Sequence, residues 1–225
     1  ARLGRAIGVL EQAAAAGREE LRSVAILGLK VATPGPDASW LPTALGELLA
    51  TQLGAGEELR LVPASDVREA ERGLGWKAAD SVPGTDLGKL RAALGADLLV
   101  AGSCSVTGDG PARLARLEVE VLDARTGAAV GSSATTGSET HLVDLVSRAG
   151  HDLRVALGLP EATPAQALGV EASFPASPAA QRRYAEGLAQ LRLPDPPTAK
   201  ATLEKAVALE PKHPMPRTAL AEAWS

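Results

Sequence analysis

Val24-Ala25-Ile26-Leu27-Gly28-Leu29 is the stretch of sequence that decides the fold. A short continuous apolar run is typical of a strand covered on both faces, as the central strands of α/β sheets are. The residues that follow predict a helix over 39–53, in which Ser39 is the expected N-cap and Pro42 fits the first turn. Its apolar residues recur at helical spacing: Leu41, Leu45, Leu48, Leu49 and Leu53. A buried strand followed by an amphipathic helix indicates an α/β fold.

The rest of the domain alternates between apolar strands and amphipathic helices. The first half is expected to contain a strand at 59–62, a short helix at 67–74 behind Ser65, a loop at 75–85 and a helix from Asp86 to Gly95. A strand at 97–102 then continues towards Val106. The second half is expected to contain a strand at 116–121, a hairpin loop at 123–127, a strand at 128–136 and a helix at 142–157. Apolar and charged residues alternate at 116–121, so one face of that strand is expected to be wet. The order predicts a layered α/β domain with a mixed sheet over residues 23–159.

Three segments flank this domain. Residues 1–22 have helical spacing and are expected to be a helix that connects to an upstream element or packs on the domain. Prolines mark 160–178 as a linker, and residues 179–225 are expected to be all helical. The sequence has no Met at position 1 and stops inside an expected helix. We therefore expect a fragment of a longer protein.

Composition excludes several classes of protein. The 225 residues carry 23 Lys and Arg against 27 Asp and Glu, a formal net charge of −4, which provides no general attraction for nucleic acid. With 45% hydrophobic residues the chain is not mostly disordered, and with 2% aromatic residues it has few stacking platforms for single strands. The single cysteine, Cys104, excludes an internal disulfide. No window approaches the about 20 apolar residues of a membrane helix, so direct membrane insertion is not predicted. The net charge and the few aromatic residues predict no nucleic-acid partner.

Several short motifs in the α/β region carry a family resemblance. In chain order they are Val24-Ala25-Ile26-Leu27-Gly28, Ser39-Trp40-Leu41-Pro42-Thr43-Ala44-Leu45, Leu94-Gly95-Ala96-Asp97, Val100-Ala101-Gly102-Ser103, Asp123-Ala124-Arg125-Thr126-Gly127 and the helix at 142–150. Together they resemble the TolB amino-terminal-like domains of bacterial signalling proteins, which often follow the kinase domain of membrane-bound serine/threonine kinases. The resemblance implies an α/β domain without catalytic residues of its own.

The C-terminal segment is similar to tetratricopeptide repeats. Ala199, Leu203, Ala206 and Pro211 have the spacing of a repeat's second helix and its closing proline. The helix before them contains Gly187 where two helices must approach closely, together with Tyr184, Leu188 and Leu191. Residues 220–224 resemble the first helix of a second repeat. The resemblance implies a surface that binds a protein or peptide partner.

Histidines and acidic residues on the last helix of the α/β domain have the spacing of a metal or acid–base site. Asp144 and His151 share one face of the helix at 142–157, and His141 precedes it. The pattern favours a solvated face instead, because the leucines of this helix lie opposite. His213 lies in a Pro-rich loop without a local partner.

Four other groups of residues have side chains that could take part in chemistry or in binding. Cys104 would need a neighbouring base to act as a nucleophile, and in an apolar strand it is expected to be buried and unreactive. The turn Gly108-Asp109-Gly110 is followed by neither a helix nor Gly-Lys-Ser/Thr, so it is no phosphate loop. Glu118 and Glu120 would suit acid–base work only in a cleft, and beside Arg116 a solvent-exposed face is expected. The remaining basic pairs are too few for nucleic acid: Arg182 with Arg183, and Arg68 with Arg72.

These observations predict no catalytic, cofactor-binding or metal-binding residue, no cofactor and no enzyme in this region. The main hypothesis is a non-catalytic sensor or protein-interaction region of a bacterial signalling protein, a serine/threonine kinase, on the extracytoplasmic (periplasmic) side of a membrane-anchored parent. The cytoplasm is the alternative location. The helical repeats are expected to bind a protein or peptide, and the α/β domain a partner or small ligand. Two other hypotheses stay open: the interaction module of an envelope-assembly or secretion lipoprotein, and a ligand-processing enzyme with an unrecognised site.

Overall fold

The computed structural model of the chain describes residues 21–32, 38–56, 58–76, 84–108, 113–191 and 197–224. Parts of three expected segments lie outside these residues: most of the helix at 1–22, most of the loop at 75–85, and the turn at 108–110 beyond its first residue. At the end of that expected first helix, Arg22 already belongs to a strand, so a helix is wrong at this residue. The reason is tertiary, because Arg22 pairs with the distant Leu59.

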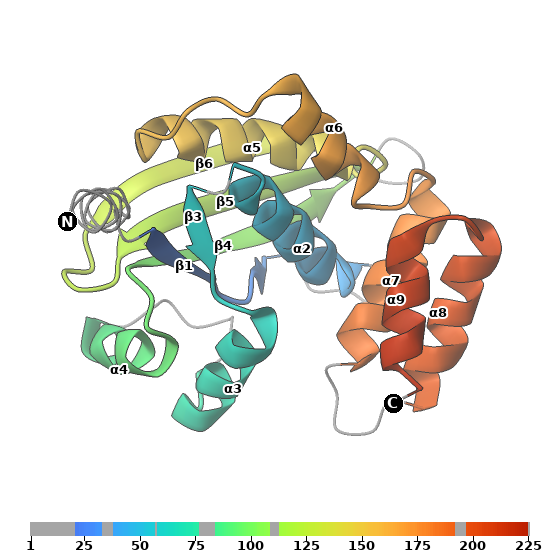
Figure 1. Ribbon diagram of the computed structural model, residues 1–225, viewed down its shortest axis with the longest axis horizontal. Helices are drawn as coiled ribbons and strands as arrows, with labels where there is room; N and C mark the ends of the chain where they lie inside the picture. Colours follow the sequence, from blue (N-terminus) through green and yellow to red (C-terminus); the bar gives the residue numbers. More distant parts are fainter. Residues whose placement is uncertain are drawn as a thin grey trace, which may run out of the picture.

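A six-stranded mixed sheet forms the centre of the protein (Figure 1). Its five main strands follow one another in the order β3-β1-β4-β5-β6. Their bounds are β1 (Arg22–Ile26), β3 (Leu59–Leu61), β4 (Leu98–Thr107), β5 (Leu114–Asp123) and β6 (Ala129–Ser138). β1 is parallel to β3 and β4, whereas β4, β5 and β6 pair antiparallel. The predicted mixed sheet is confirmed.

A short strand beside β4 was not predicted. β2 (Lys30–Val31) pairs in parallel with Ser103 and Cys104 of β4. β1 pairs with an earlier part of the same strand, so residues 27–29 link two stretches of pairing. The two-residue strand depends on β4, which is distant in sequence, and its own sequence therefore does not mark it.

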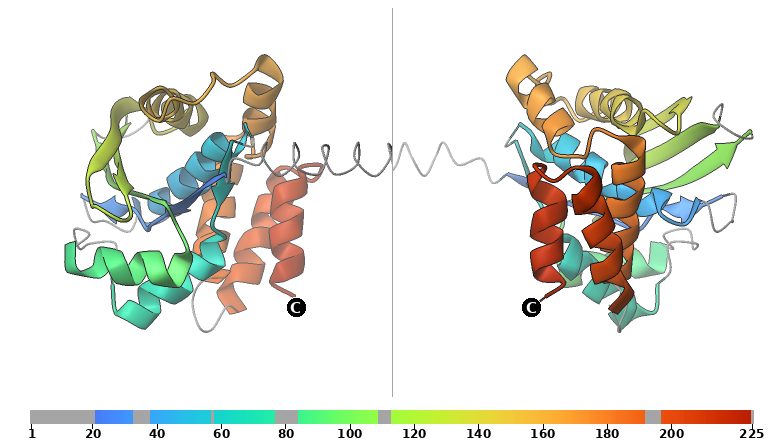
Figure 2. Two further views of the ribbon diagram at one scale, coloured as in Figure 1. Left: turned by 60° about the vertical axis from the view of Figure 1, so that its left-hand side comes forward. Right: turned by 90° about the vertical axis from the view of Figure 1, so that its right-hand side faces the viewer.

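One face of the sheet is covered by α2 (Leu41–Gly54) and α5 (Leu142–Ala156), as Figures 1 and 2 show. Their leucines share one core with the apolar residues of β5. The N-cap of α2 is Trp40 rather than Ser39, and no side chain caps the helix. Trp40 is buried, so packing and Pro42 in the first turn fix the start of this helix.

On the other face, the helices that the structure describes cover the parallel half of the sheet. There α3 (Ala64–Leu74) and α4 (Gly84–Leu94) pack against Ala25 and Leu99. α3 begins one residue before Ser65, and α4 begins two residues before Asp86, where it was expected to start. In the part of the chain that the structure describes, no helix covers the second face of β5 and β6.

The expected linker at 160–178 contains a helix, α6 (Pro164–Ala172). Thr163 and Gln166 form a capping box before it: the Thr163 N–H donates to Gln166 Oε1 (2.7 Å), and the Gln166 N–H donates to Thr163 Oγ1 (3.3 Å). Pro164 fits the first helical position, where no amide hydrogen bond is required. The prolines of this segment therefore start a helix as well as break one.

Three helices complete the chain: α7 (Pro178–Leu191), α8 (Pro197–Leu209) and α9 (Pro214–Glu222) (Figure 2). A Cβ atom on Gly187 would lie 2.5 Å from the Leu203 side chain, so α7 and α8 approach closely at this glycine, as predicted. Tyr184 and Leu203 belong to the same core as α2 and α5. The fold class, an α/β domain followed by a helical segment, is confirmed.

Candidate interaction site

β5 turns its charged residues to the uncovered face of the sheet. Buried apolar residues alternate along the strand with exposed Glu118 and Glu120, as the sequence predicted. The sheet register places Ser103 of β4 and Ala134 of β6 on either side of Glu118. The residues that flank Glu120 are equally small: Ala101 and Ser132. Both carboxylates therefore stand among short side chains on an open surface.

The two glutamates differ in their partners. Arg116 donates to Glu118 Oε1 from Nε (2.9 Å) and Nη2 (2.6 Å), and Ser103 Oγ donates to the other oxygen at 3.4 Å. The Arg116 and Glu118 side chains are each 51% exposed, so this ion pair contributes little stability. Among the described residues Glu120 has no hydrogen-bond or ion-pair partner. Glu120 therefore offers a free carboxylate to a ligand.

The open face is hollowed into a shallow cleft of about 790 Å³. The cleft brings Lys30 of β2 together with Glu118, Glu120 and Ser132. Trp76, which follows α3, also lines it, and its buried indole N–H has no hydrogen-bond partner among the residues that the structure describes. Glu118 and Glu120 therefore line the same cleft, and a shared cleft is the condition that the sequence sets for a role of these two carboxylates. The charges and hydroxyls of the cleft suit the binding of polar and cationic groups.

β6 borders this face as the last strand of the sheet. It is ten residues long and contains neither a charged residue nor a proline. The face of β6 opposite the open face packs against α5. There Ser133 Oγ donates to Asp152 Oδ2 (2.6 Å), and Thr135 Oγ1 donates to the Leu145 carbonyl (3.3 Å). Beyond β6 no further strand pairs with it within the described ranges. Every second residue of such an edge turns its backbone N–H and C=O outward.

The histidines do not assemble into a site. His141 is the residue before α5, and its Nδ1 lies 3.0 Å from Thr140 Oγ1. Asp144 and His151 are exposed on α5, the solvated face that the pattern favours. His213 has a structural role that was not predicted, because its Nδ1 accepts the Met215 N–H (3.3 Å) at the start of α9. In the part of the chain that is described, no three His, Cys, Asp or Glu residues group to hold a metal.

Cys104 and the basic pairs have structural surroundings. Cys104 is buried in β4, and this burial raises the pKa of its thiol to about 11, which keeps it protonated. Arg182 and Arg183 both bind Glu186 on their own helix. Arg72 Nε donates to the Arg68 carbonyl at 3.4 Å. The structure brings none of these groups to the cleft of the open face.

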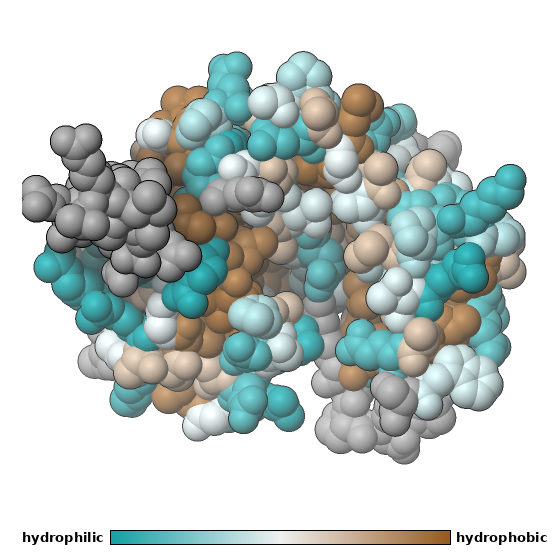
Figure 3. Space-filling view, in the orientation of Figure 1, coloured by the Kyte–Doolittle hydropathy of each residue, from teal (hydrophilic) through white to brown (hydrophobic). Residues whose placement is uncertain are grey.

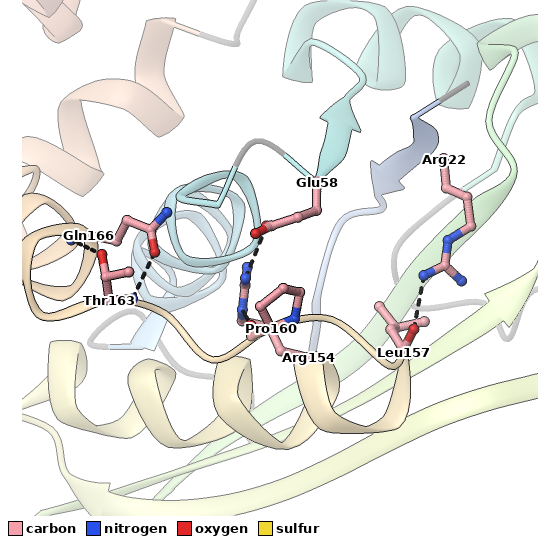
Figure 4. Close-up of polar contacts among 7 residues, drawn as sticks. All are labelled: Arg22, Glu58, Arg154, Leu157, Pro160, Thr163 and Gln166. Carbon is pink, nitrogen blue, oxygen red and sulfur yellow. Dashed lines mark hydrogen bonds and ion pairs between the residues drawn. The ribbon is translucent and has the colours of Figure 1, made fainter. Parts of the chain in front are cut away.

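The sequence pattern did not predict the buried charge of Arg154, on the last helix of the α/β domain. Arg154 of α5 is 2% exposed, and its Nη2 binds Glu58 Oε2 at 3.0 Å (Figure 4). Its Nε donates to the Pro160 carbonyl at 2.8 Å, and Arg22 Nη2 donates to the Leu157 carbonyl at 2.9 Å. These bonds tie the turn before β3, the end of α5 and the start of β1 together. Arg154 follows the buried Gly150 by four residues and so lies on the same face of α5. This position on the apolar face is the sequence signal that could have predicted the burial of Arg154.

None of the described helices is long and apolar enough to cross a membrane. Comparison with known proteins finds no matching family model and no matching curated protein.

Several solved structures are similar at low identity. Lipoprotein GNA1162 from Neisseria meningitidis is 19% identical, with a TM-score of 0.42 over 52% of this chain and 79% of that one. The LpoB C-terminal domain from Escherichia coli is 21% identical, with a TM-score of 0.40 over 52% and 83%. TolB from Acinetobacter baumannii is 10% identical, with a TM-score of 0.40 over 64% of this chain and 30% of that one. At these values the likeness assigns neither a family nor a function to the chain.

Proposed function

We propose that this chain is a non-catalytic protein-interaction module that binds an extended segment of a partner protein along the free edge of β6. The observation that carries the proposal is the edge itself, ten residues at the end of the sheet without charge or proline. Natural proteins usually protect a free edge with lysine, proline or a bulge. The register of β6 shifts at Val130, and Arg148 Nη2 of α5 donates to the Thr136 carbonyl at 2.8 Å. The regular stretch between these two points, residues 131–135, is the template on which a further strand can form main-chain hydrogen bonds.

The open face beside the edge supports a basic partner segment. Every second side chain of an added strand would lie on the same face as Glu118 and Glu120. Only the short side chains of Ser132 and Ala134 stand between that strand and the two carboxylates. Two strand spacings amount to about 10 Å, which a lysine or arginine and a glutamate span together. The preferred segment therefore has Lys or Arg at alternate positions.

Selection from a library of random ten-residue peptides tests the proposal. We expect peptides with basic residues at alternate positions to be enriched on the unmodified chain. Ala134→Lys should abolish their binding, because an edge lysine opposes strand addition and neutralises Glu118. Ala172→Lys adds the same charge at the exposed end of α6 and should bind as the unmodified chain does.

Two readouts separate the outcomes. Bound peptide should slow the hydrogen exchange of β6 amides. If the peptide slows exchange only in other elements, it binds elsewhere and the proposal is refuted. Sedimentation reports whether the edge pairs with a second copy of the chain. A dimer that Ala134→Lys dissociates, and that the peptides do not, would assign the edge to self-association.

The parent protein and its location are part of the same proposal. The sequence resemblance supports an extracytoplasmic module, in either an envelope-assembly lipoprotein or a serine/threonine kinase. The lipoprotein parent has a counterpart in GNA1162, and the kinase parent has none among the structures named above. Peptide binding by the helical segment also stays a prediction. The full-length gene distinguishes the parents, because one encodes a lipoprotein signal and the other a kinase catalytic loop upstream.

A further inference from the structure

The backbone groups that β6 turns to its free side follow from a hydrogen bond just beyond the strand. The Glu139 N–H donates to the Arg113 carbonyl at 3.1 Å, so the backbone of Glu139 points towards the β5 side. In an antiparallel pair, successive residues point alternately towards the neighbouring strand and away from it. The register is regular from 131 to 138, so residues at odd positions point towards β5. The outward residues are therefore Ser132, Ala134 and Thr136.

Arg148 of α5 ends this outward row. Its Nη2 donates to the Thr136 carbonyl at 2.8 Å, in agreement with an outward-facing Thr136. The next outward carbonyl, that of Ser138, accepts the His141 N–H at 3.0 Å. Both outward carbonyls at this end of β6 are occupied, so Ala134 is the last residue that can form both main-chain bonds with an added strand.

The charge of Arg148 is not neutralised in the part of the chain that is described. Its guanidinium donates to two neutral carbonyls, that of Thr136 and, from Nε at 3.4 Å, that of Asp144. No described Asp or Glu forms an ion pair with it, and its Nη1 has no hydrogen-bond partner there. A Cβ atom on Gly137 would lie 2.9 Å from Nη2, so glycine leaves the guanidinium room against β6. An unpaired cation is thus held at the end of the edge.

Opposite charges mark the two ends of this pairing site. Glu120 of β5, which has no partner among the described residues, lies directly opposite Ser132, whereas Arg148 lies beside Thr136. A carboxylate of a partner can accept the remaining N–H groups of the guanidinium in a charge-assisted hydrogen bond. Figure 3 shows hydrophilic residues interspersed with apolar ones along the top of the molecule, where Figure 1 places α5 and α6. A matching segment therefore carries a basic residue at one end and an acidic residue at the other.

We propose that Arg148 terminates the added strand and selects a segment whose basic residue is preceded by an acidic one. This selection depends on the proposed function, because it acts at the same edge. An antiparallel segment forms both main-chain bonds with Ser132 and Ala134 through the residue opposite each of them. Its basic residue lies opposite Ser132, on the side of Glu120. The chain before the residue opposite Ala134 reaches Arg148, so Asp or Glu is expected three or four positions before the basic residue.

Selection of random ten-residue peptides on a charge-reversed variant tests the role of Arg148. We expect Asp or Glu three or four positions before the basic residue on the unmodified chain, and Lys or Arg at these positions on Arg148→Glu. Arg72→Glu is the matched control, because Arg72 of α3 is also exposed and its Nε donates to the carbonyl four residues earlier, at 3.4 Å. This control should select the same peptides as the unmodified chain. Circular dichroism of both variants verifies that they fold.

Calorimetric titration with one selected peptide measures the contribution of Arg148. Replacement of the acidic residue of the peptide by its amide should weaken binding to the unmodified chain about threefold to fivefold, as expected for a partly exposed ion pair. The same replacement should leave the affinity for Arg148→Gln unchanged, because the cation is absent from that variant. An equal loss of affinity on both proteins would show that another group binds the carboxylate.

Hydrogen exchange distinguishes failure of this selection from failure of the proposed function. If selected peptides slow exchange of the Ser132 and Ala134 amides but keep their acidic residues on Arg148→Glu, the role of Arg148 is refuted and the proposed function stands. If no peptide slows exchange of these amides, both are refuted. In the free chain the two amides should exchange faster than those of Ser133 and Thr135, and the opposite order would refute the outward row on which the selection depends.

Discussion

Replacement of Arg154 by alanine should destabilise the protein by about 3 kcal/mol. Removal of one partner from a buried ion pair generally costs about 3–5 kcal/mol, because the other charge is left uncompensated. Arg154 is buried, but the Glu58 side chain keeps 29% exposure and can be rehydrated, which places the expected loss at the low end of this range. The Pro160 carbonyl loses its donor in the same variant.

Arg154→Met separates the charge from the packing. Methionine keeps much of the side-chain volume and removes a buried guanidinium whose Nη1 has no hydrogen-bond partner in the described structure. We expect a smaller loss than for Arg154→Ala, about 2 kcal/mol, because Glu58 and the Pro160 carbonyl lose the same partner in both variants and methionine keeps the packing. Arg182→Ala is the control, because its pair with Glu186 is partly exposed, at 38% and 20%, and should contribute at most about 1 kcal/mol.

Urea unfolding followed by circular dichroism measures these differences, and equal slopes against urea concentration verify that the same surface is exposed. A loss for Arg154→Ala no larger than for Arg182→Ala would refute the reasoning. The bonds of Arg154 would then be compensated by water, and the tie between the turn before β3 and the end of α5 would contribute nothing to the folded state.

Two further predictions concern the core and the pH dependence of stability. Leu45 of α2 is fully buried, so Leu45→Asp should lower the free energy of unfolding by several kcal/mol, and an unchanged thermal midpoint would contradict the packing of α2. The hydrogen bond from the Ser23 N–H holds the pKa of the Asp97 carboxyl below its usual value. Ionised Asp97 therefore stabilises the folded state above about pH 4, and this contribution to the free energy of unfolding is lost as the pH falls through the lower folded-state pKa. Asp97→Asn should therefore reduce the loss of unfolding free energy in this acid range, and identical acid titrations of stability for both proteins would show that the bond has no such effect.

The elements that the sequence predicted are those whose signal is local. The strand beginning at Val24, the alternating strand around Val119 and the helix containing Leu145 each follow from the spacing of apolar residues within one segment. β2 and the buried Arg154 could not be found in this way, because each depends on a partner far away in sequence. α6 had a local signal, the capping box at Thr163, which its prolines concealed.

The candidate site was predicted only in its parts. Alternation along β5 placed Glu118 and Glu120 on one wet face, which the structure confirms. That this face forms a cleft depends on Lys30 of β2 and on Trp76, whose positions follow from the sheet and from α3. The free edge of β6 likewise depends on strand order, which periodicity within one strand does not determine. Local pattern therefore predicts which side chains are exposed, and topology decides which of them meet.

α2 packs against the sheet, against α5 and against α7. Tyr184 and Ala185 of α7 belong to the same apolar core as the leucines of α2, so residues beyond the α/β domain complete the burial of that helix. The two regions are therefore expected to unfold cooperatively, in a single transition. Removal of the C-terminal helices would uncover apolar surface on α2 and make the remaining chain prone to aggregate.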